Sequence, residues 1–428
     1  MPSLSDKLKA LGVNIGAQNL PQPAEKLTHQ VGATKLEETL SGHFLKNSQG
    51  TTFVVDTHYP LDYHQGKVGL LTSARLKMLS EWVGDQKIAD MSPESFAFLD
   101  TETTGLSGGT GTYAFLIGAA RFESDEFHLA QFFMNDPADE PALLLGLEEF
   151  LAPCQSIVTF NGKSFDAPLI NTRFITHGWK TPLLDMVHVD LLHLARRLWR
   201  GRLPSRTLGN LEVQILGSER TEEDIPGWAI PQMYFDYIRS GDPEPLKSVF
   251  YHNAMDVVSL AALFNHTAGL LAEPLDIPLQ HGIDLIALAR LYEDLGELDT
   301  AIQLYIQGLA YEDQQDSQIA PEFRLSQEAL LDAIERLALI HKRQDNYEAA
   351  IPLWEKAAQA EHLGAHIELA KFYEHRMRNY GEAMHWAESA LGIVNTPGFR
   401  RSERLLWLEN LENRIARLKR KLEKNNQT

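Results

Sequence analysis

The chain has 428 residues, of which 44% are hydrophobic and 23% are charged, and its formal net charge is −19. This is globular composition with room for roughly two to four domains, and it excludes a collagen-like rod or a chain that is disordered throughout. The acidic average argues against a generic nucleic-acid coat protein, although a local basic track is compatible with it. No run approaches about 18 consecutive apolar residues, so we expect neither a transmembrane helix nor a membrane partner.

The first twenty residues lack the apolar core of a secretory signal, and the chain has a single cysteine, Cys154. No intrachain disulfide can therefore form, which favours a reducing, cytoplasmic location. No catalytic partner for the thiol is evident, and we expect Cys154 to be buried and structural.

Residues 1–90 are predicted to form an N-terminal extension that is only partly ordered. The segment holds short apolar pieces, such as residues 53–55, and a helical stretch near residues 70–83. His58 and His64 flank Asp62, but this spacing matches no familiar metal-ligand pattern. We therefore interpret both histidines as ordinary surface or core residues.

Residues 91–272 have the pattern of an α/β domain. Apolar segments joined by short turns predict strands at residues 96–99, 113–122, 127–134 and 156–160. Helices are expected at residues 141–151, 168–176, 187–199, 232–240 and 246–271. A strand meander followed by helices around a further buried strand indicates a mixed sheet flanked by helices.

Residues 276–428 predict helices alone. The segments that contain Ala350 and Ala383 share one pattern, and the two alanines lie 33 residues apart. A period of this length, with small residues where helices cross, resembles tetratricopeptide repeats. Residues 400–424 are expected to form a capping helix with a basic tail.

Four acidic residues have positions that suggest chemistry. Asp100 and Glu102 come at the end of the first predicted strand of this domain, and because strand side chains alternate, both carboxylates lie on one face. Such a pair repels unless water solvates it or a divalent cation lies between the two groups. Asp166 opens a predicted helix, and Asp256 shares a helical face with His252. Taken alone, Asp166 is typical of a helix-capping acid, and the pair of His252 and Asp256 is typical of a surface contact.

Together, the four acids in this order resemble the DEDD superfamily of 3′-to-5′ exonucleases, which have a ribonuclease H-like fold. The resemblance is carried by residues 100–106 (DTETTGL), 108–113 (GGTGTY) and 161–166 (NGKSFD). The wider match is similar to the YprB-type bacterial ribonuclease H-like family, whose members also carry tetratricopeptide-like C-terminal helices. It covers about residues 95–270 strongly and the repeats loosely.

The resemblance implies hydrolysis of phosphodiester bonds in single-stranded DNA or RNA from the 3′ end, with two Mg²⁺ or Mn²⁺ ions as cofactors. Hard cations prefer oxygen ligands, which carboxylates supply. By resemblance, Asp100 would bridge both ions, and Glu102 and Asp166 would complete their coordination. Asp256 would hold the ion on the side of the nucleophile.

The residue that assists the attacking water departs from the family pattern. One DEDD subgroup has a tyrosine four residues before the last aspartate, and the other has a histidine five residues before it. Here His252 lies four residues and Tyr251 five residues before Asp256, so the residue types are exchanged. Histidine is the usual general base in enzymes, and His252 shares a face with Asp256, which favours it as general base or water-orienting group. Tyr251 would point about 100° away around the helix, and the choice stays open at this stage.

The motifs also predict a substrate-binding surface. By resemblance, the substrate-binding residues are Thr103, Gly105, Leu106, Asn161, Lys163, Ser164, Phe165, Arg206 and Tyr251. Asp190 either supports the site from behind or caps a helix.

An arginine run surrounds Trp199, with no acid among its members, which are Arg196, Arg197, Arg200, Arg202 and Arg206. Arginines pair with phosphates and an aromatic ring can stack on a base, which indicates a substrate track. The alternative is a solvated helix face with Trp199 in the core, and the sequence does not separate the two.

A function of a different class also stays open. The alternative is a catalytically weak ribonuclease H-like module that acts as a nucleic-acid or protein-binding scaffold through its helical repeats. The complete set of four acids favours catalysis, because bound metal is what relieves their mutual repulsion. A protein partner on the repeats is compatible with either function.

Overall fold

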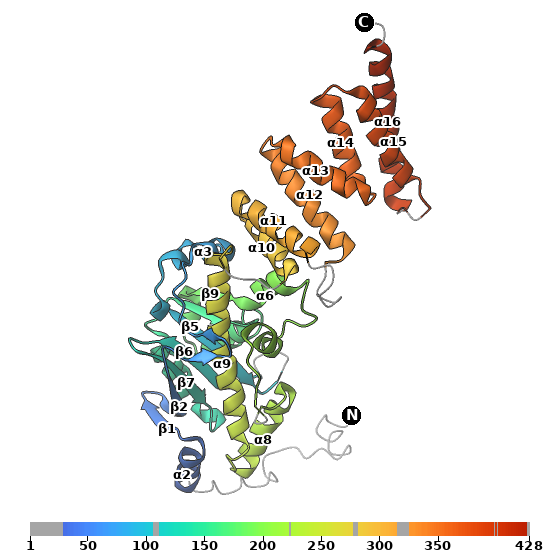
Figure 1. The fold of residues 1–428 in the computed structure, drawn as a ribbon. Coiled ribbons are helices and arrows are strands. Elements are labelled where there is room, and N and C mark those ends of the chain that lie inside the picture. Colours follow the sequence, from blue (N-terminus) through green and yellow to red (C-terminus); the bar gives the residue numbers. More distant parts are fainter. Residues whose placement is uncertain are drawn as a thin grey trace, which may run out of the picture.

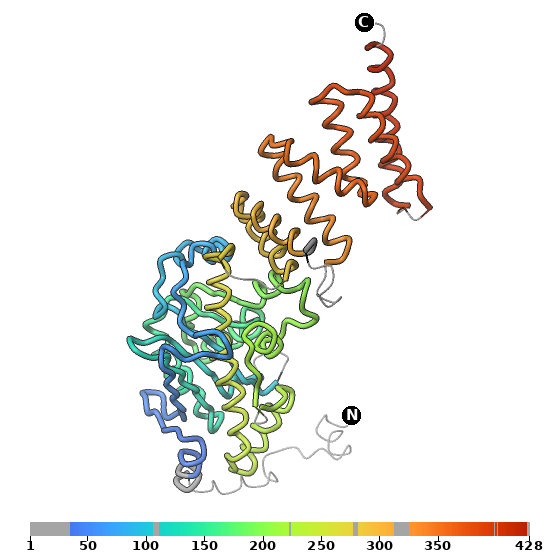
Figure 2. Tube along the Cα trace, in the orientation of Figure 1, coloured from blue at the N-terminus to red at the C-terminus, as the bar shows by residue number. Residues whose placement is uncertain are grey.

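The computed structural model describes residues 29–105, 111–221, 224–276, 281–314, 325–397, 399 and 401–425. An α/β body is followed by a stack of paired helices that extends away from it (Figure 1). The Cα trace in Figure 2 shows the chain passing from the one part to the other through the long helix α9 (Leu246–Ala272). The predicted fold class, a ribonuclease H-like domain followed by tetratricopeptide-like helices, is confirmed.

A seven-stranded mixed sheet forms the centre of the body, in the order β1-β2-β7-β6-β5-β8-β9. Its strands are β1 (His43–Asn47), β2 (Gly50–Pro60), β5 (Phe96–Thr103), β6 (Ala114–Phe122), β7 (Glu126–Phe133), β8 (Ser156–Thr159) and β9 (Val187–Asp190). A small hairpin of β3 (His64–Gln65) and β4 (Val68–Gly69) lies outside it. β5 runs antiparallel to β6 and parallel to β8, and β8 runs parallel to β9. The carboxyl ends of β5, β8 and β9 therefore meet at one edge, where ligands bind in open α/β sheets.

Residues 43–60 belong to this sheet, which corrects their assignment to an N-terminal extension. β2 pairs with β7 from Phe53 opposite Phe133 to Pro60 opposite Glu126. Phe53 and Val54 are buried in the core that this pairing creates. The pairing joins segments far apart in the chain, and a short apolar piece does not reveal such a partner by itself. Residues 1–28 of the predicted extension lie outside the described residues.

Residues 187–190 form a strand, although the sequence analysis placed them at the start of a helix. Val187 and Val189 are β-branched and favour extended backbone. Asp190 then caps α6 (Leu191–Trp199) by accepting a hydrogen bond from the backbone N–H of Leu192 at 3.1 Å. The helix expected at residues 70–83 is also shorter than predicted, and only α3 (Lys77–Val83) forms.

Helices cover both faces of the sheet. On one face, α9 packs with α3 and α6 against Phe96 and Phe98. On the other, α4 (Glu140–Leu151) and α5 (Asp166–Thr176) pack against Ala97 and Leu99, with α8 (Ile230–Ser240) beside them. Because side chains alternate along β5, Asp100 and Glu102 lie on the α9 face.

By length and composition alone, α9 would qualify as a membrane span, but 67% of its most apolar window is buried inside the protein. A core helix has these same properties, so a single such helix is a weak indication of a membrane. Here the buried side of α9 forms much of the core beneath the site.

The repeats pair their helices in chain order. They are α10 (Gly282–Asp294) with α11 (Leu298–Gln314), α12 (Gln327–Arg343) with α13 (Tyr347–Gln359), and α14 (Leu363–His375) with α15 (Tyr380–Val394). Ala301, Ala350 and Ala383 are fully buried, as the repeat pattern predicts for close crossings. The final helix α16 (Arg401–Asn425) packs on α15 as the cap. One continuous apolar core runs from the sheet to Leu369 on α14, so the first repeats are joined firmly to the body.

The isolated residues noted in the sequence have structural partners. His58 stacks on His128, with ring centroids 4.4 Å apart, and lies 2.8 Å from Glu126. His64 contacts the backbone carbonyl of Asp62. Cys154 is buried, and burial raises the pKa of its thiol to about 11, which leaves it unreactive.

Candidate active site

Asp100 and Glu102 stand at the carboxyl end of β5, where α9 comes closest to the sheet. Asp100 pairs across the sheet with Gly118 on β6. A Cβ atom at Gly118 would lie 2.3 Å from the side-chain oxygen of Asn253, so glycine is what lets α9 approach. Asn253 donates its Nδ2–H to Asp100 Oδ2 at 3.0 Å. The pairing with β6 becomes irregular directly after Glu102, and the strand ends there.

Asp166 reaches the same place from the end of β8. The connecting turn begins at Asn161, which has a left-handed φ of 68°. It continues through Gly162, where a Cβ atom would lie 2.5 Å from Thr159. Thr101 donates its hydroxyl hydrogen to Asp166 Oδ1 at 2.5 Å. The side chain of Asp166 is thus fixed beside β5.

Asp190 holds this turn from the neighbouring strand β9. Its carboxylate accepts hydrogen bonds from the backbone N–H groups of Asn161 and Lys163, at 2.8 and 3.1 Å. The same carboxylate caps α6. Both roles considered for Asp190 in the sequence therefore apply.

The middle of α9 supplies His252 and Asp256. The Nε2 atom of His252 lies 3.7 Å from Asp256 Oδ2 and 4.0 Å from Glu102 Oε1. The Nδ1 atom lies 2.7 Å from Asp224 Oδ1, so the ring is held from behind. Tyr251 points elsewhere, and its hydroxyl accepts a hydrogen bond from Thr221 at 3.0 Å. Of the two candidates, the structure brings His252 to the acids.

Burial and mutual repulsion dominate the electrostatics of the cluster. Burial, and after it the charges of Asp256 and Asp166, raise the pKa values of Asp100 and Glu102 well above their usual range. Burial raises the pKa of Asp166 to about 6 against the hydrogen bond from Thr101. Burial also raises the pKa of Asp256, although Arg220 opposes the shift. Among the described residues, Arg220 is the cation that offsets the four acids, and its effect is smaller than that of burial.

Arg220 is the functional candidate that the sequence analysis missed. Its guanidinium pairs with Asp256, with Glu212 at 2.5 Å and with Asp224 at 3.3 Å. Glu212 opens a π-helical turn, residues 212–216, a rare form that is frequent at functional sites. The local sequence around Arg220 is typical of an exposed charged loop, and no spacing rule connects it to an acid on α9.

The donor set fits a divalent cation by its chemistry, since four carboxylates offer hard oxygen ligands and a deficit of positive charge. Within the described ranges there is, however, no group of three or more acidic, histidine or cysteine side chains arranged to hold a metal ion. The hydrogen bonds explain the difference: Arg220 engages Asp256, Asn253 engages Asp100, and Thr101 engages Asp166. A cation would have to take the place of Arg220 beside Asp256.

Only some of the predicted substrate-binding residues lie beside the acids in the structure. Lys163, Ser164 and Phe165 are exposed at the start of α5, next to Asp166, and Phe165 is 57% exposed. Thr103 instead shapes the turn after β5 by donating to the carbonyl of Gly105 at 3.0 Å. Leu106 lies outside the described residues. Asn161 and Arg206 line one cavity together, whereas Tyr251 faces the loop that contains Thr221.

The arginine run is divided between the core and the surface, and its role as a substrate track stays a prediction. Trp199 is 2% exposed and belongs to the core, and Arg202 forms a buried ion pair with Asp284 at 2.8 Å. Arg197 pairs with Asp294 on α10. The remaining arginines of the run line open space, and they are Arg196, Arg200 and Arg206.

The comparisons with known proteins agree with this architecture. The RNase_H superfamily model matches residues 97–268, a range that contains all four acids, and a tetratricopeptide repeat model matches residues 285–317. The class of the protein is therefore a ribonuclease H superfamily domain followed by tetratricopeptide repeats. The chain is 37% identical over 331 residues to the uncharacterized protein YprB of Bacillus subtilis (strain 168), over 76% of this chain and 74% of YprB. It belongs to the YprB family.

Proposed function

We propose that this protein is a metal-dependent nuclease that hydrolyses phosphodiester bonds, and that it acts as a 3′-to-5′ exonuclease on single-stranded nucleic acid. The observation that carries the proposal is the buried cluster of Asp100, Glu102, Asp166 and Asp256, in which neighbouring charges add to the effect of burial. Such a cluster costs folding stability unless cations enter it, and perturbed carboxylates of this kind are typical of functional sites. The polarity of digestion follows from the family resemblance.

In this proposal the four carboxylates hold divalent cations, Mg²⁺ or Mn²⁺. When bound, such ions supply a nucleophilic water at neutral pH and stabilise the charge that develops on the phosphate. Asn253 and Thr101 keep Asp100 and Asp166 oriented for this task through their hydrogen bonds. When no divalent cation is bound, Arg220 supplies positive charge to Asp256. Arg220 has to leave Asp256 when a cation enters.

His252 is the proposed general base. A carboxylate against Nδ1 favours the tautomer with its proton there, which leaves Nε2 as the acceptor on the side of the acids. The attacking water would give its proton to Nε2. Asp224 is then a positioning residue for the ring. Phe165, exposed beside Asp166, is placed to stack on a base, and Lys163 to contact a phosphate.

The test is digestion of 5′-labelled single-stranded DNA and RNA with Mg²⁺, Mn²⁺ or EDTA. The proposal expects a metal-dependent ladder that shortens from the 3′ end, absent for Asp100→Asn. Asp185→Asn is the matched control, because Asp185 is exposed and pairs with Lys180 on the surface. If the wild-type protein cuts neither polymer with either metal, the proposal is wrong.

One observation favours the second candidate, a catalytically silent binding module. Arg220 already compensates Asp256, so an arginine could stand permanently where an active nuclease has a cation. The two candidates differ in metal affinity, which isothermal titration calorimetry with Mn²⁺ measures directly. Measurable Mn²⁺ binding that Asp256→Asn weakens supports the nuclease, and absence of binding supports the scaffold.

A further inference from the structure

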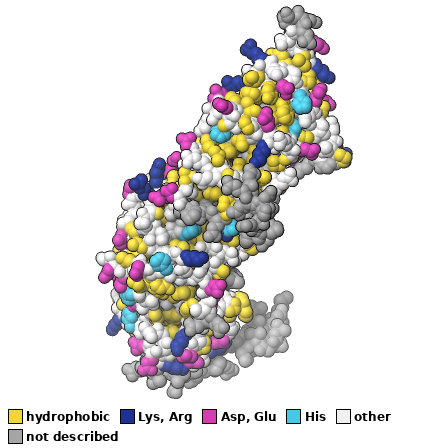
Figure 3. Space-filling view, viewed as in Figure 1, with side chains coloured by type: hydrophobic (Ala, Val, Ile, Leu, Met, Phe, Trp, Pro, Cys, Tyr) yellow, Lys and Arg dark blue, Asp and Glu magenta, His cyan; other side chains and the backbone are white. Residues whose placement is uncertain are grey.

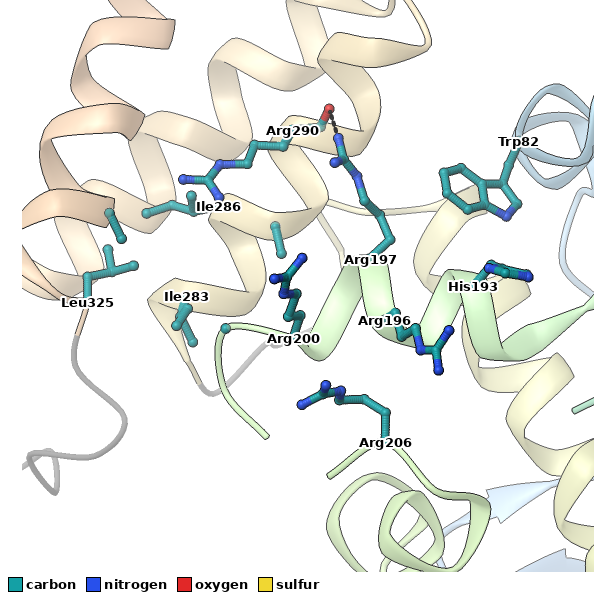
Figure 4. Close-up of a pocket in the computed structure, with 13 residues that line it drawn as sticks. Trp82, His193, Arg196, Arg197, Arg200, Arg206, Ile283, Ile286, Arg290 and Leu325 are labelled. Atoms are coloured by element: carbon teal, nitrogen blue, oxygen red, sulfur yellow. Dashed lines mark hydrogen bonds between the residues drawn. The ribbon is translucent and has the colours of Figure 1, made fainter. Parts of the chain in front are cut away.

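A cavity of about 800 Å³ lies between the α/β body and the first repeat, and arginines dominate its polar lining. They come from α6, from the loop that follows it and from α10, and they are Arg196, Arg197, Arg200, Arg206 and Arg290. In Figure 4 the guanidinium groups of Arg200 and Arg206 project toward the same space between the elements. Among the residues that the structure describes, no acidic side chain lines this cavity. By contrast, acidic and basic side chains are interspersed over the face of the molecule seen in Figure 3.

The positive charge in this cavity is only partly compensated. Asp294 and Asp332 pair with Arg197 and Arg290. Among the described residues, by contrast, no carboxylate pairs with Arg196, Arg200 or Arg206. The Nε–H groups of Arg197, Arg206 and Arg290 are also buried with no acceptor in that part of the chain. The guanidinium groups of Arg196 and Arg200, which have no carboxylate partner among the described residues, are the ones that an anion in the cavity would pair with.

A second cavity brings the basic lining to the turn that leads to Asp166. Arg196 and Arg206 also line this second cavity of about 450 Å³, which extends to Phe160 and Asn161. Asn161 begins the turn that leads to Asp166. Because the two cavities share Arg196 and Arg206, we treat them together as the junction groove, whose lining comes from within residues 160–161, 192–208 and 283–290, with Trp82, Leu325 and Ala329. An extended anion in this groove would have one end at the turn that carries Asp166.

The walls of the groove are held in fixed positions. Arg202 and Asp284 form an ion pair across the junction at 2.8 Å, and both side chains are less than a tenth exposed. Gly201 lies against Ile283, and a Cβ atom there would come within 2.9 Å of it. The helices α6 and α10 are thus in direct contact, and Ile283 and Ile286 add an apolar strip to the basic lining. Guanidinium groups beside an apolar strip suit a chain of phosphates joined by sugars and bases.

We propose that the junction groove binds the phosphodiester backbone of the strand being degraded, on the side away from its 3′ end. The inference rests on the proposed function and deepens it, because it gives the first repeat a direct part in substrate binding through Arg290 and α10. An acidic protein segment is the competing occupant. The nucleic acid is favoured because the groove reaches Asn161, in the turn that carries Asp166, where the proposed reaction takes place.

The experiment measures binding of fluorescein-labelled single-stranded oligonucleotides to the full-length protein by anisotropy, in EDTA, so that hydrolysis is not required. A tetranucleotide is compared with an oligomer of about 20 nucleotides across a salt series. We expect the double variant Arg196→Ala/Arg200→Ala to lose the preference for the longer strand. The slope of log K (the binding constant) against log salt concentration should become shallower by about 1.4, because two phosphate contacts are lost. Arg343→Ala, an exposed arginine on α12 outside the groove, should change neither value.

The outcomes separate the two proposals. An unchanged salt slope and length preference in the double variant would overturn the junction groove as the binding site, whatever the nuclease assay shows. Displacement of the oligonucleotide by polyglutamate at equal charge would overturn it in favour of an acidic protein segment. Arg196→Lys/Arg200→Lys keeps the charge, and the salt slope should return to the wild-type value. Melting curves establish that each variant is folded.

Discussion

The candidate active site and the last repeat both bury acidic side chains, and the negative charge is balanced very differently in the two places. In the candidate active site, four acids share little more than the single cation of Arg220. Burial raises all four pKa values, and repulsion within the cluster adds to it at Asp100 and Glu102. In the last repeat, Glu374 on α14 is also fully buried. There the charge is amply balanced.

The balance at Glu374 comes from α16. Arg414, Arg417 and Lys421 approach its oxygens at 2.5, 2.8 and 3.0 Å. Burial alone would raise the pKa of Glu374, but the hydrogen bonds from Arg417 and Lys421 and the charges of the arginines lower it to about 2. A buried acid with three cations fastens the capping helix. A buried cluster with too few cations keeps an unmet demand for positive charge, which is what a metal or substrate site requires.

The largest test of this comparison is Asp100→Asn. We expect nuclease activity to fall by about 10³-fold, because a metal ligand at the centre of the cluster is lost. In EDTA, the same change should raise the melting temperature, because one buried negative charge disappears. Activity on labelled oligonucleotides and thermal melting check the two effects. A lower melting temperature in EDTA would show that the cluster is not electrostatically strained.

Glu374→Gln should destabilise the protein, whereas Asp100→Asn should stabilise it in EDTA. Removing the charge leaves three cations of α16 without their partner, and the free energy of unfolding should fall by about 2–3 kcal/mol. Urea unfolding followed by circular dichroism measures the loss. Glu361→Gln is a matched control, since Glu361 is exposed in the loop before α14. Equal effects of the two changes would remove the contrast between the regions.

Changing the pH should act on the two regions in opposite directions. The pKa of Asp166 is raised to about 6 in the folded protein, so the folded state takes up protons first, and the metal-free protein should gain about 1–2 kcal/mol of stability as the pH falls from 7 to 5. The pKa of Glu374 is lowered from 4.5 to about 2, so its contribution is present above pH 4.5 and is lost as the pH falls toward 2. Urea unfolding across this range measures both phases. Asp166→Asn should reduce the first phase only, and Glu374→Gln the second only.

The smallest expected effect concerns Arg220→Gln. The guanidinium competes with a cation for Asp256, so its removal should tighten Mn²⁺ binding about fivefold, near 1 kcal/mol. Titration calorimetry compares the variant with Arg239→Gln, an exposed arginine on α8. Mn²⁺ affinity that is the same in the wild type and the Arg220 variant would mean that Arg220 and the cation do not share a position.

Much of the site could be predicted because its signals are local. The period of two along β5 places Asp100 and Glu102 on one face, and the period of a helix places His252 and Asp256 on another. The order of these acids in the chain then identified the family and the fold. The turn before Asp166 also has a local signal, since Asn and Gly at positions 161 and 162 are residues typical of turns.

What the sequence did not reveal depends on contacts between distant segments. Arg220 reaches Asp256 only because a π-helical turn redirects the chain after Glu212, and no local pattern encodes that path. In the same way, β2 became part of the sheet through pairing with β7, a partner that lies far along the chain. The roles within the arginine run could not be predicted from the sequence either. Only the fold shows that Arg202 is buried against Asp284 of α10 whereas Arg200 lines the cavity.

The position of α9 late in the domain has a consequence for synthesis of the protein. A nascent chain that ends before Leu246 already contains β5, β8 and the start of α5, and so it contains Asp100, Glu102 and Asp166. It lacks the fourth acid, the amide of Asn253 that orients Asp100, and the apolar surface that covers Phe98. The cluster therefore assembles only after α9 has left the ribosome. A chain interrupted before that point carries no complete set of acids, which confines the proposed nuclease activity to finished domains.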